Sequence, residues 1–259
     1  MKKLNFILLL LLVLSVGLVS AQGQTGSNSS DPFDVQLRFY KSALKNYDLQ
    51  AATVALYTMQ ALKPERSDLN DSLALLYFAG ERWAQAYLVG QAIVNGDPKR
   101  NDMLEMVAVS KQNLGMIKES LADYEKLYGT EKSVYFLYQM ATLQYQLKRY
   151  GECVASLDQI LVSADADKQK VNIRVQGGTQ DVPMKAAAYN VKGICALEIN
   201  QPDAAKDNFN KALQAYPDFV LAKANLETLA KKQAGGAGTT AKPAAGTTKP
   251  ATTPAAVKH

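Results

Sequence analysis

The sequence predicts an all-α fold, an α–α superhelix of stacked helical hairpins with one short β-hairpin-like insertion. Two observations lead to this prediction. Apolar residues recur at every third or fourth position in runs of about 12 to 15 residues, which is the spacing of one face of a helix. The same order of small and large residues also returns along the chain at a near-constant interval, which indicates a solenoid of repeats.

The repeat interval is about 34 residues, which lies in the range of periods that indicates stacked repeats. The first three units begin at Phe33, Ser67 and Asn101, at equal steps along the chain. The fourth unit begins near Val134, and a fifth begins near Ala186 after an interruption. We therefore expect repeats over 33–66, 67–100, 101–133, 134–161 and 186–219, an insertion over 162–185 between the fourth and fifth repeats, and a capping helix over 220–233.

The units share an order of side chains. A small residue is followed four positions later by a large one and then by another apolar residue, and several units end in proline. Small residues would let the two helices of a unit approach closely, and the proline would end the second helix. The residues that we assign to this signature are Ala52, Ala86, Ala141, Gly193, Ala205, Phe209, Ala212 and Pro217.

A helix–turn–helix unit of this length with this signature resembles the tetratricopeptide repeat (TPR). The resemblance covers residues 33–233, and five units in near-constant register carry it. It implies that the first helices of successive units line a concave groove in which partner peptides bind. The lysine and asparagine clamp for which the family is known is not recognisable in this chain.

The insertion is the part of the expected fold that lacks a helical pattern. Val171, Ile173 and Val175 alternate with other residues, and the pair Gly177–Gly178 follows them. This pattern predicts a β-hairpin or an ordered loop. A glycine pair can also mark a phosphate site, but no helix opens directly after it and no Gly-Lys-Ser/Thr motif follows. A turn is therefore the better interpretation.

The first 21 residues have the layout of a signal peptide, with two lysines, an apolar run from Leu4 to Val19 and a cleavage site between Ala21 and Gln22. An uncleaved membrane anchor is the alternative, although a typical span has about 20 apolar residues. No cysteine for lipid attachment lies near the cleavage site. We expect an exported, periplasmic bacterial protein with a flexible linker over 22–32 and a disordered Ala/Thr/Pro/Lys tail over 234–259.

The net charge of +5 comes from the two ends of the chain. Two lysines are in the leader and three are in the tail, which leaves 24 basic and 24 acidic residues between them. A neutral folded part without a basic stripe argues against nucleic acid as the partner. The tail lysines are candidates for contact with the cell wall or a membrane surface.

The sequence contains no arrangement typical of catalysis or metal binding. The single histidine, His259, ends the tail, which excludes histidine-based catalytic and zinc sites. An exported protein could pair Cys153 with Cys195, but both occupy positions for small buried residues, which favours two packed thiols. We therefore expect no enzymatic activity, no metal and no cofactor.

The outward faces of the first helices would form the partner-binding groove. These faces are acidic in the second and third units and aromatic in the fourth. Complementary charge then favours a protein or peptide partner with basic and apolar side chains. In a second interpretation the acids only keep the surface soluble and the tyrosines pack between helices. The candidate groove residues are Asp68, Asp71, Asp102, Glu105, Tyr135, Tyr138, Tyr145 and Asn190.

The predicted function is a non-catalytic scaffold or adaptor for protein–protein interaction in the bacterial cell envelope. The alternative is a structural envelope component that the basic tail tethers to the cell wall or to a membrane surface. In a third hypothesis, the spaced lysines of the tail bind back into the acidic groove.

Overall fold

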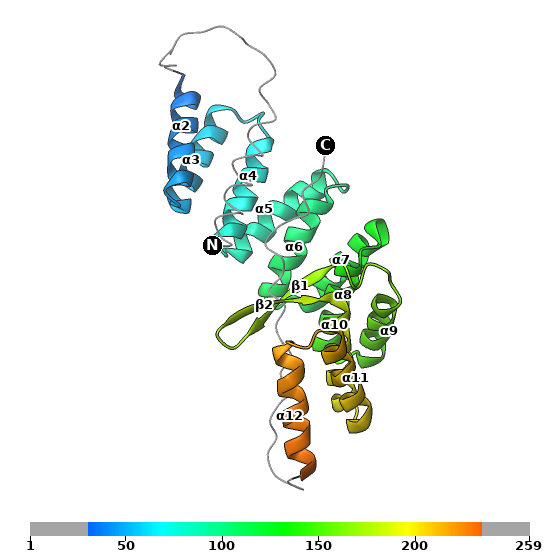
Figure 1. Cartoon of the computed structure of the whole chain (residues 1–259). Helices are drawn as coiled ribbons and strands as arrows, with labels where there is room; N and C mark the ends of the chain where they lie inside the picture. Colours follow the sequence, from blue (N-terminus) through cyan, green and yellow to red (C-terminus); the bar gives the residue numbers. More distant parts are fainter. Residues whose placement is uncertain (1–30, 235–259) are drawn as a thin grey trace. The chain divides into compact units, whose positions relative to one another are not determined.

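The structure is a computed structural model that describes residues 31–234 of the chain. The expected signal peptide (1–21), all but the last two residues of the linker (22–32) and the tail beyond residue 234 lie outside this range. Within it, eleven helices and a two-stranded antiparallel sheet follow one another (Figure 1). The predicted helical class with an inserted β-hairpin is confirmed.

The described chain divides into two compact units between Gly115 and Met116. The first unit contains α2 (Pro32–Lys45), α3 (Leu49–Leu62), α4 (Asp68–Ala79), α5 (Trp83–Gly96) and α6 (Asn101–Asn113). The second unit contains α7 (Ile117–Glu131), α8 (Val134–Gln146), α9 (Tyr150–Leu161), β1 (Lys170–Val175), β2 (Gly178–Pro183), α10 (Met184–Glu198), α11 (Pro202–Ala215) and α12 (Val220–Ala234).

Side-chain caps determine where the first two helices begin. Asp31 Oδ1 accepts the N–H of Phe33 at 2.9 Å, and Pro32 occupies the first turn of α2. Asp48 Oδ1 accepts the N–H of Ala51 at 2.9 Å at the start of α3. A cap of this kind stabilises a helix by about 1 kcal/mol. The first helix therefore begins one residue before the expected unit boundary at 33.

Left-handed residues mark the turns between helices at the repeat interval. Tyr47, Glu81 and Gly115 have φ angles of 58°, 57° and 79°, and they follow one another at equal steps of one repeat. Two turns of the second unit use Lys148 and Asn200, with φ angles of 59° and 58°. The repeat is thus present in the backbone as well as in the side chains. Gly115 avoids the steric cost of this conformation, and Asn200 belongs to a residue type that tolerates it.

Small residues are buried where helices of the first unit pack together. Ala52 and Ala86 are fully buried. A Cβ atom added at Gly90 of α5 would lie 2.7 Å from Met106 Cε and 2.9 Å from Val107 Cγ2, both on α6. The approach of α5 to α6 therefore leaves room for no side chain at Gly90.

The helical hairpin of α10 and α11 contains an even closer contact. A Cβ atom added at Gly193 of α10 would lie 2.5 Å from Phe209 Cε1 on α11. Ala205 and Ala212, on the same helix as the phenylalanine, are fully buried. Pro217 is exposed in the turn that follows α11. The signature residues of the last repeat thus lie at the contact between its helices and at its end.

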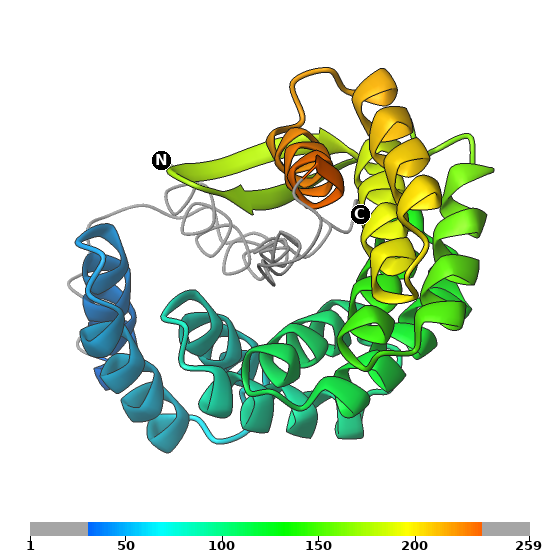
Figure 2. The same cartoon turned by 90° about the horizontal axis from the view of Figure 1, so that it is seen from below.

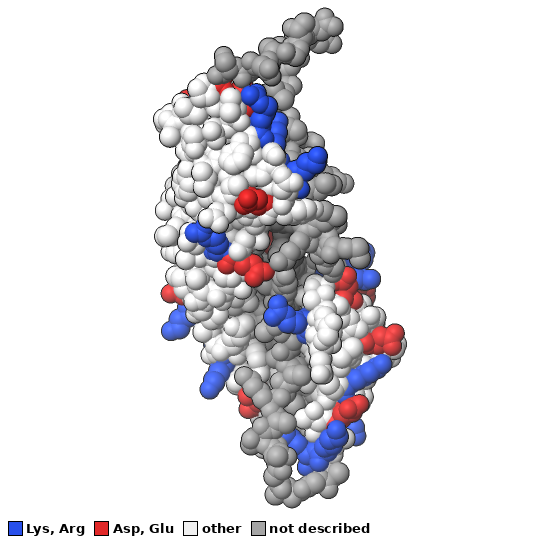
Figure 3. Space-filling view, turned by 90° about the vertical axis from the view of Figure 1, so that its left-hand side faces the viewer, with Lys and Arg blue, Asp and Glu red and all other residues white. Residues whose placement is uncertain are grey.

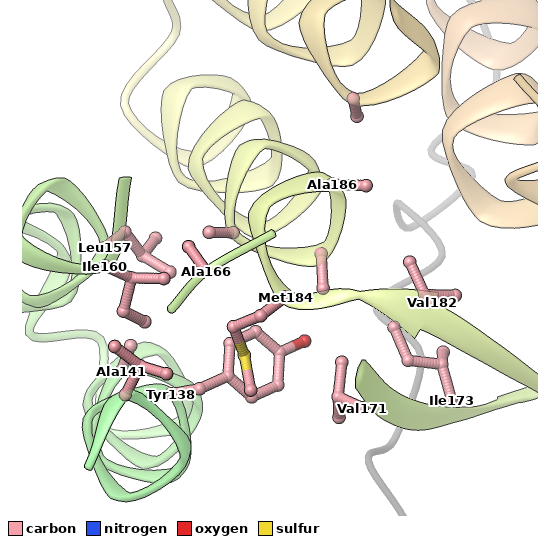
Figure 4. Close-up of a cluster of buried hydrophobic side chains, with 14 of the residues drawn as sticks. Tyr138, Ala141, Leu157, Ile160, Ala166, Val171, Ile173, Val182, Met184 and Ala186 are labelled. Carbon is pink, nitrogen blue, oxygen red and sulfur yellow. The ribbon is translucent and has the colours of Figure 1, made fainter. Parts of the chain in front are cut away.

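The insertion forms a β-hairpin that packs on the helices of the second unit. Val171 of β1 lies opposite Val182 of β2, and both are buried together with Ile173. These side chains belong to a hydrophobic cluster that also contains Tyr138 of α8 and Met184 of α10 (Figure 4). The alternation in the sequence therefore marks the face of the hairpin that contacts the helices.

The last helix, α12, closes the second unit beside the hairpin (Figure 2). Gln180 of β2 joins the two elements, because its Nε2 donates to the carbonyl oxygen of Asp218 at 2.6 Å and its Oε1 accepts the N–H of Val220 at 3.2 Å. In the interior, Asn225 Nδ2 of α12 donates to Asn190 Oδ1 of α10 at 3.0 Å. These contacts fix α12 as a cap on the last repeat.

Candidate partner-binding surface

A cleft of about 760 Å³ opens in the first unit between the beginning of α4 and the end of α5. We call it the α4–α5 cleft. Helix α5 contributes mainly apolar side chains, and the charged side chains come from α4 and from the segment that follows α5. Its lining includes Asp68, Asp71, Leu88, Ile93, Asp97 and Arg100.

The apolar side of the cleft is exposed because α5 is only partly covered by its neighbours. The helix has no charged residue, yet only Ala86 and Gly90 are fully buried. Leu88 is 64% exposed, and Ile93 is half-buried. Apolar carbon of this kind loses its unfavourable contact with water when a partner covers it. The cleft therefore has a favourable surface for apolar side chains.

Charged side chains are also sparse on α3. This helix has no charged residue, and its Val54 and Tyr57 are 56% and 51% exposed. Figure 3 views the molecule from the side on which α2 and α3 lie and shows wide areas without acidic or basic side chains. Val54 and Tyr57 therefore add exposed apolar carbon to a helix without charge.

Two arginines hold the carboxylates at the cleft in place. Arg100 contacts Asp102 at two points, with Nε–Oδ1 at 2.9 Å and Nη2–Oδ2 at 2.7 Å, and its Nη2 also lies 2.9 Å from Asp71 Oδ2. Arg66 makes the same two-point contact with Asp68, at 2.7 and 2.6 Å. Two-point contacts are stronger and more directional than single hydrogen bonds.

These contacts also shift the protonation equilibria. The hydrogen bond from Arg66 lowers the pKa of Asp68. Burial alone would raise the pKa of Asp102, but the hydrogen bond and charge of Arg100 outweigh it, and the pKa is lowered. The hydrogen bond to Asp102 raises the pKa of Arg100. All of these groups are therefore charged at neutral pH, and the ion pairs persist.

The charge of the predicted acidic face is largely compensated. Asp68 and Asp71 line the cleft, and Asp102 is joined to them through Arg100, but each of the three carboxylates contacts an arginine. The third aspartate of the lining, Asp97, accepts the N–H of Lys99 at 3.0 Å. Charge alone therefore does not select the partner at this surface.

Three of the predicted groove residues lie in the interior, which corrects their assignment to an exposed face. Glu105 is 7% exposed, Tyr138 is 2% exposed and Asn190 is 3% exposed. Tyr138 is covered because it packs in the cluster that contains the hairpin (Figure 4), and Asn190 is bonded to Asn225 of the capping helix. Glu105 belongs to a stretch of α6, Met103–Lys111, in which every residue is buried.

The other two predicted tyrosines, Tyr135 and Tyr145, are half-buried. Tyr145 OH of α8 donates to Glu198 Oε1 of α10 at 3.0 Å, and Tyr150 OH of α9 donates to the second oxygen at 3.3 Å. The ring of Tyr135 packs on Phe136 with centroids 5.5 Å apart. For Tyr145, packing between helices describes the contacts better than an open aromatic groove.

The sequence reasoning missed the two arginines and the apolar side of α5. Arg66 and Arg100 each stand two positions before an aspartate and are separated by one repeat interval, so the repeat itself contained this signal. The exposure of Leu88 had no such signal, because it depends on which neighbours leave α5 uncovered.

The described part of the chain places few reactive groups together. Residues 31–234 contain no group of three or more His, Cys, Asp or Glu side chains that could hold a metal ion. None of the helices in this range is long and apolar enough to span a membrane.

The α4–α5 cleft itself combines exposed apolar carbon with fixed charges, and this combination is suited to binding.

No protein-family model matches the chain, and a comparison with curated proteins gives no significant match. Solved structures do match. YrrB, described as a TPR protein with an unusual peptide-binding site, is 13% identical, with 73% of this chain and 89% of YrrB covered at a TM-score of 0.56. A tetratricopeptide repeat protein from Parabacteroides merdae is 17% identical, with 78% and 75% covered at a TM-score of 0.60.

A third structure, that of MamA, is 10% identical, with 81% of this chain and 98% of MamA covered at a TM-score of 0.56. Identities this low leave the sequences almost unrelated, so what the proteins share is their fold. That fold is the repeated helical hairpin that the regular interval in the sequence predicts.

Proposed function

We propose that this chain, whose fold is that of tetratricopeptide repeat proteins, is a non-catalytic scaffold that binds a segment of a partner protein at the α4–α5 cleft. The observation that carries the proposal is the cleft of about 760 Å³ in which Leu88 is 64% exposed beside fixed carboxylates. This volume falls within the roughly 300–1,000 Å³ of typical binding sites. It is large enough for several side chains of a peptide.

A partner segment that fits this cleft has an apolar anchor and a basic group. The anchor would cover Leu88 and Ile93, and each Å² of apolar area removed from water contributes about 25 cal/mol. Three aspartates and one arginine line the cleft, and with Arg66 beside Asp68 counted as well, three acids against two bases leave a formal charge of −1, which weakly favours a cation over an anion. Because the arginine contacts are already made, the carboxylates keep their positions when the partner arrives.

Two further observations support a binding role. YrrB, which has the same fold, is described as having a peptide-binding site. In addition, stacked repeats present a preformed surface, which reduces the entropy lost on binding.

We place the scaffold in the bacterial cell envelope, with export directed by the first 21 residues. The support is the leader pattern with its cleavage site between Ala21 and Gln22. Fractionation and N-terminal sequencing test this part of the proposal. A periplasmic protein that begins at Gln22 agrees with it, whereas a membrane-bound protein that retains Met1 favours the uncleaved anchor.

Site-specific photo-crosslinking tests the cleft. A benzophenone amino acid at position 88 should crosslink a discrete partner in cells that express the full chain. The same amino acid at position 162 is the matched control, because Val162 is 86% exposed but lies after α9 in the second unit. Leu88→Ser should abolish co-purification of that partner, and Val162→Ser should not.

Two results would contradict the proposal. One is equal crosslinking of the same proteins from positions 88 and 162. The other is an unchanged yield of the partner with Leu88→Ser. Since the side chain of Leu88 is mostly exposed, this substitution should leave the melting temperature unchanged, which separates lost binding from lost folding.

A further inference from the structure

The two cysteines of the chain lie next to each other in the second unit. Cys153 of α9 and Cys195 of α10 are fully buried, and their Sγ atoms are 3.4 Å apart. Both are free thiols in the structure. They are separated by 42 positions in the sequence, and the β-hairpin lies in the segment between them.

The surroundings of the pair are apolar. Both cysteines belong to the hydrophobic cluster that contains Ala141 and Leu157. The contact with Cys195, together with burial, raises the pKa of the Cys153 thiol. Since the thiolate is the form that attacks disulfides, the pair is protected from exchange once the unit has folded.

We propose that Cys153 and Cys195 form an intramolecular disulfide that links α9 to α10 across the hairpin insertion. Bonded sulfur atoms are about 2.05 Å apart, so these two need to approach by about 1.4 Å. From the sequence alone, positions for small residues favour two packed thiols. The structure has them as two packed thiols, in agreement with that expectation, and their separation of 3.4 Å is the observation from which we infer that they can be oxidised to a disulfide.

The oxidant is a disulfide compound, such as glutathione disulfide or the disulfide of an exchange protein. One cysteine thiolate attacks the oxidant, forms a mixed disulfide and releases one oxidant thiol. The second cysteine thiolate then attacks the cysteine sulfur of the mixed disulfide and releases the other. The two protein thiols lose two protons and two electrons, and the oxidant is reduced to two thiols.

Burial determines when this reaction takes place. In the folded unit neither sulfur is accessible to an oxidant, so the exchange occurs before α9 and α10 have packed. The bond then closes a loop that contains the whole insertion, which restricts the unfolded chain at the point where the repeats are interrupted. The disulfide would therefore stabilise the second unit at the contact between α9 and α10, two helices of successive repeats that the insertion joins by a long connection.

A redox equilibrium with the full chain tests the proposal. The reduced and the oxidised protein are each unfolded in urea with graded mixtures of glutathione and glutathione disulfide, and each sample is then either diluted into native buffer to refold in the same mixture or kept in urea. Acid quenching, alkylation and intact mass then give the fraction that contains the internal disulfide. We expect the equilibrium constant for this bond to be at least about tenfold larger in native buffer than in urea.

The proposal is overturned if the equilibrium constant for the internal disulfide is equal or smaller in native buffer than in urea, because the fold would then hold the sulfur atoms in a geometry that disfavours the bond. A mixed disulfide with glutathione as the main native product overturns it as well. Cys153→Ser, with one thiol left, is the control and should give no internal disulfide in either buffer. A higher melting temperature for the oxidised than for the reduced protein is a second supporting readout that needs no variant.

Discussion

Replacing Gly193 with alanine inserts one methyl group into the contact between α10 and α11. The new Cβ would lie 2.5, 2.7 and 3.0 Å from Cε1, Cδ1 and Cζ of Phe209. The ring is fully buried and packs with Ala205 and Leu229, so it has little room to move away. Overpacking of this kind costs about 1–3 kcal/mol. Alanine also gains about 1 kcal/mol over glycine in a helix interior, which leaves a net destabilisation of about 0–2 kcal/mol.

A matched glycine isolates the steric part of this effect. Gly129 lies within α7 of the same unit, and a Cβ added there would meet nothing within 4 Å. Gly129→Ala should therefore keep the gain in helix propensity without the clash. Urea unfolding followed by circular dichroism should place Gly193→Ala about 1–3 kcal/mol below Gly129→Ala in free energy of unfolding.

A second background checks the cause. With Phe209→Leu the ring is absent, so Gly193→Ala should cost less than it does in the wild-type chain, and the two substitutions should be non-additive. Equal unfolding midpoints for Gly193→Ala and Gly129→Ala would refute the reasoning, because the ring could then not lie against the Cα of Gly193.

Three further predictions concern single residues and their effect on the free energy of unfolding. Gly115→Ala should destabilise the chain by about 1–2 kcal/mol in urea unfolding, because Gly115 has a φ angle of 79°, which L-residues adopt at a cost. Asn225→Ala leaves the buried amide of Asn190 without this hydrogen bond and should lower the free energy of unfolding by about 1–3 kcal/mol. Burial raises the pKa of Tyr40 to about 12, above its unfolded value of about 10. The contribution of this tyrosine to stability should therefore be complete below pH 10 and lost as the pH rises toward 12. The urea midpoint of Tyr40→Phe should fall less steeply across this range than that of the wild-type chain.

The parts of the fold that could be predicted from the sequence depend on local periodicity. Gly193 and Ala205 stand where small residues recur from unit to unit, so their burial follows from the repeat itself. The alternation of Val171 and Ile173 likewise identifies the strand that packs inward. In each case the pattern that predicts burial lies within one repeat or one strand.

The parts that could not be predicted depend on neighbours that are distant in sequence. Tyr138 is buried because the hairpin, which comes only after the whole of α9, packs in the same cluster. Asn190 is buried where Asn225 of the capping helix meets it. The left-handed turns at Tyr47 and Glu81 also had no signal in residue type, because such turns usually recruit glycine or asparagine.

The charges at the α4–α5 cleft show why counting acidic residues is a poor guide to a binding surface. The count suggests an attractive face for a basic partner, but Arg100 bridges a carboxylate of α4 and a carboxylate of α6. Opposite charges held this close cancel much of each other's field before it reaches a partner, and salt screens the remainder within about 8 Å. In the proposed binding mode the apolar area around Leu88 would supply most of the affinity, and the fixed charges would mainly orient the bound segment.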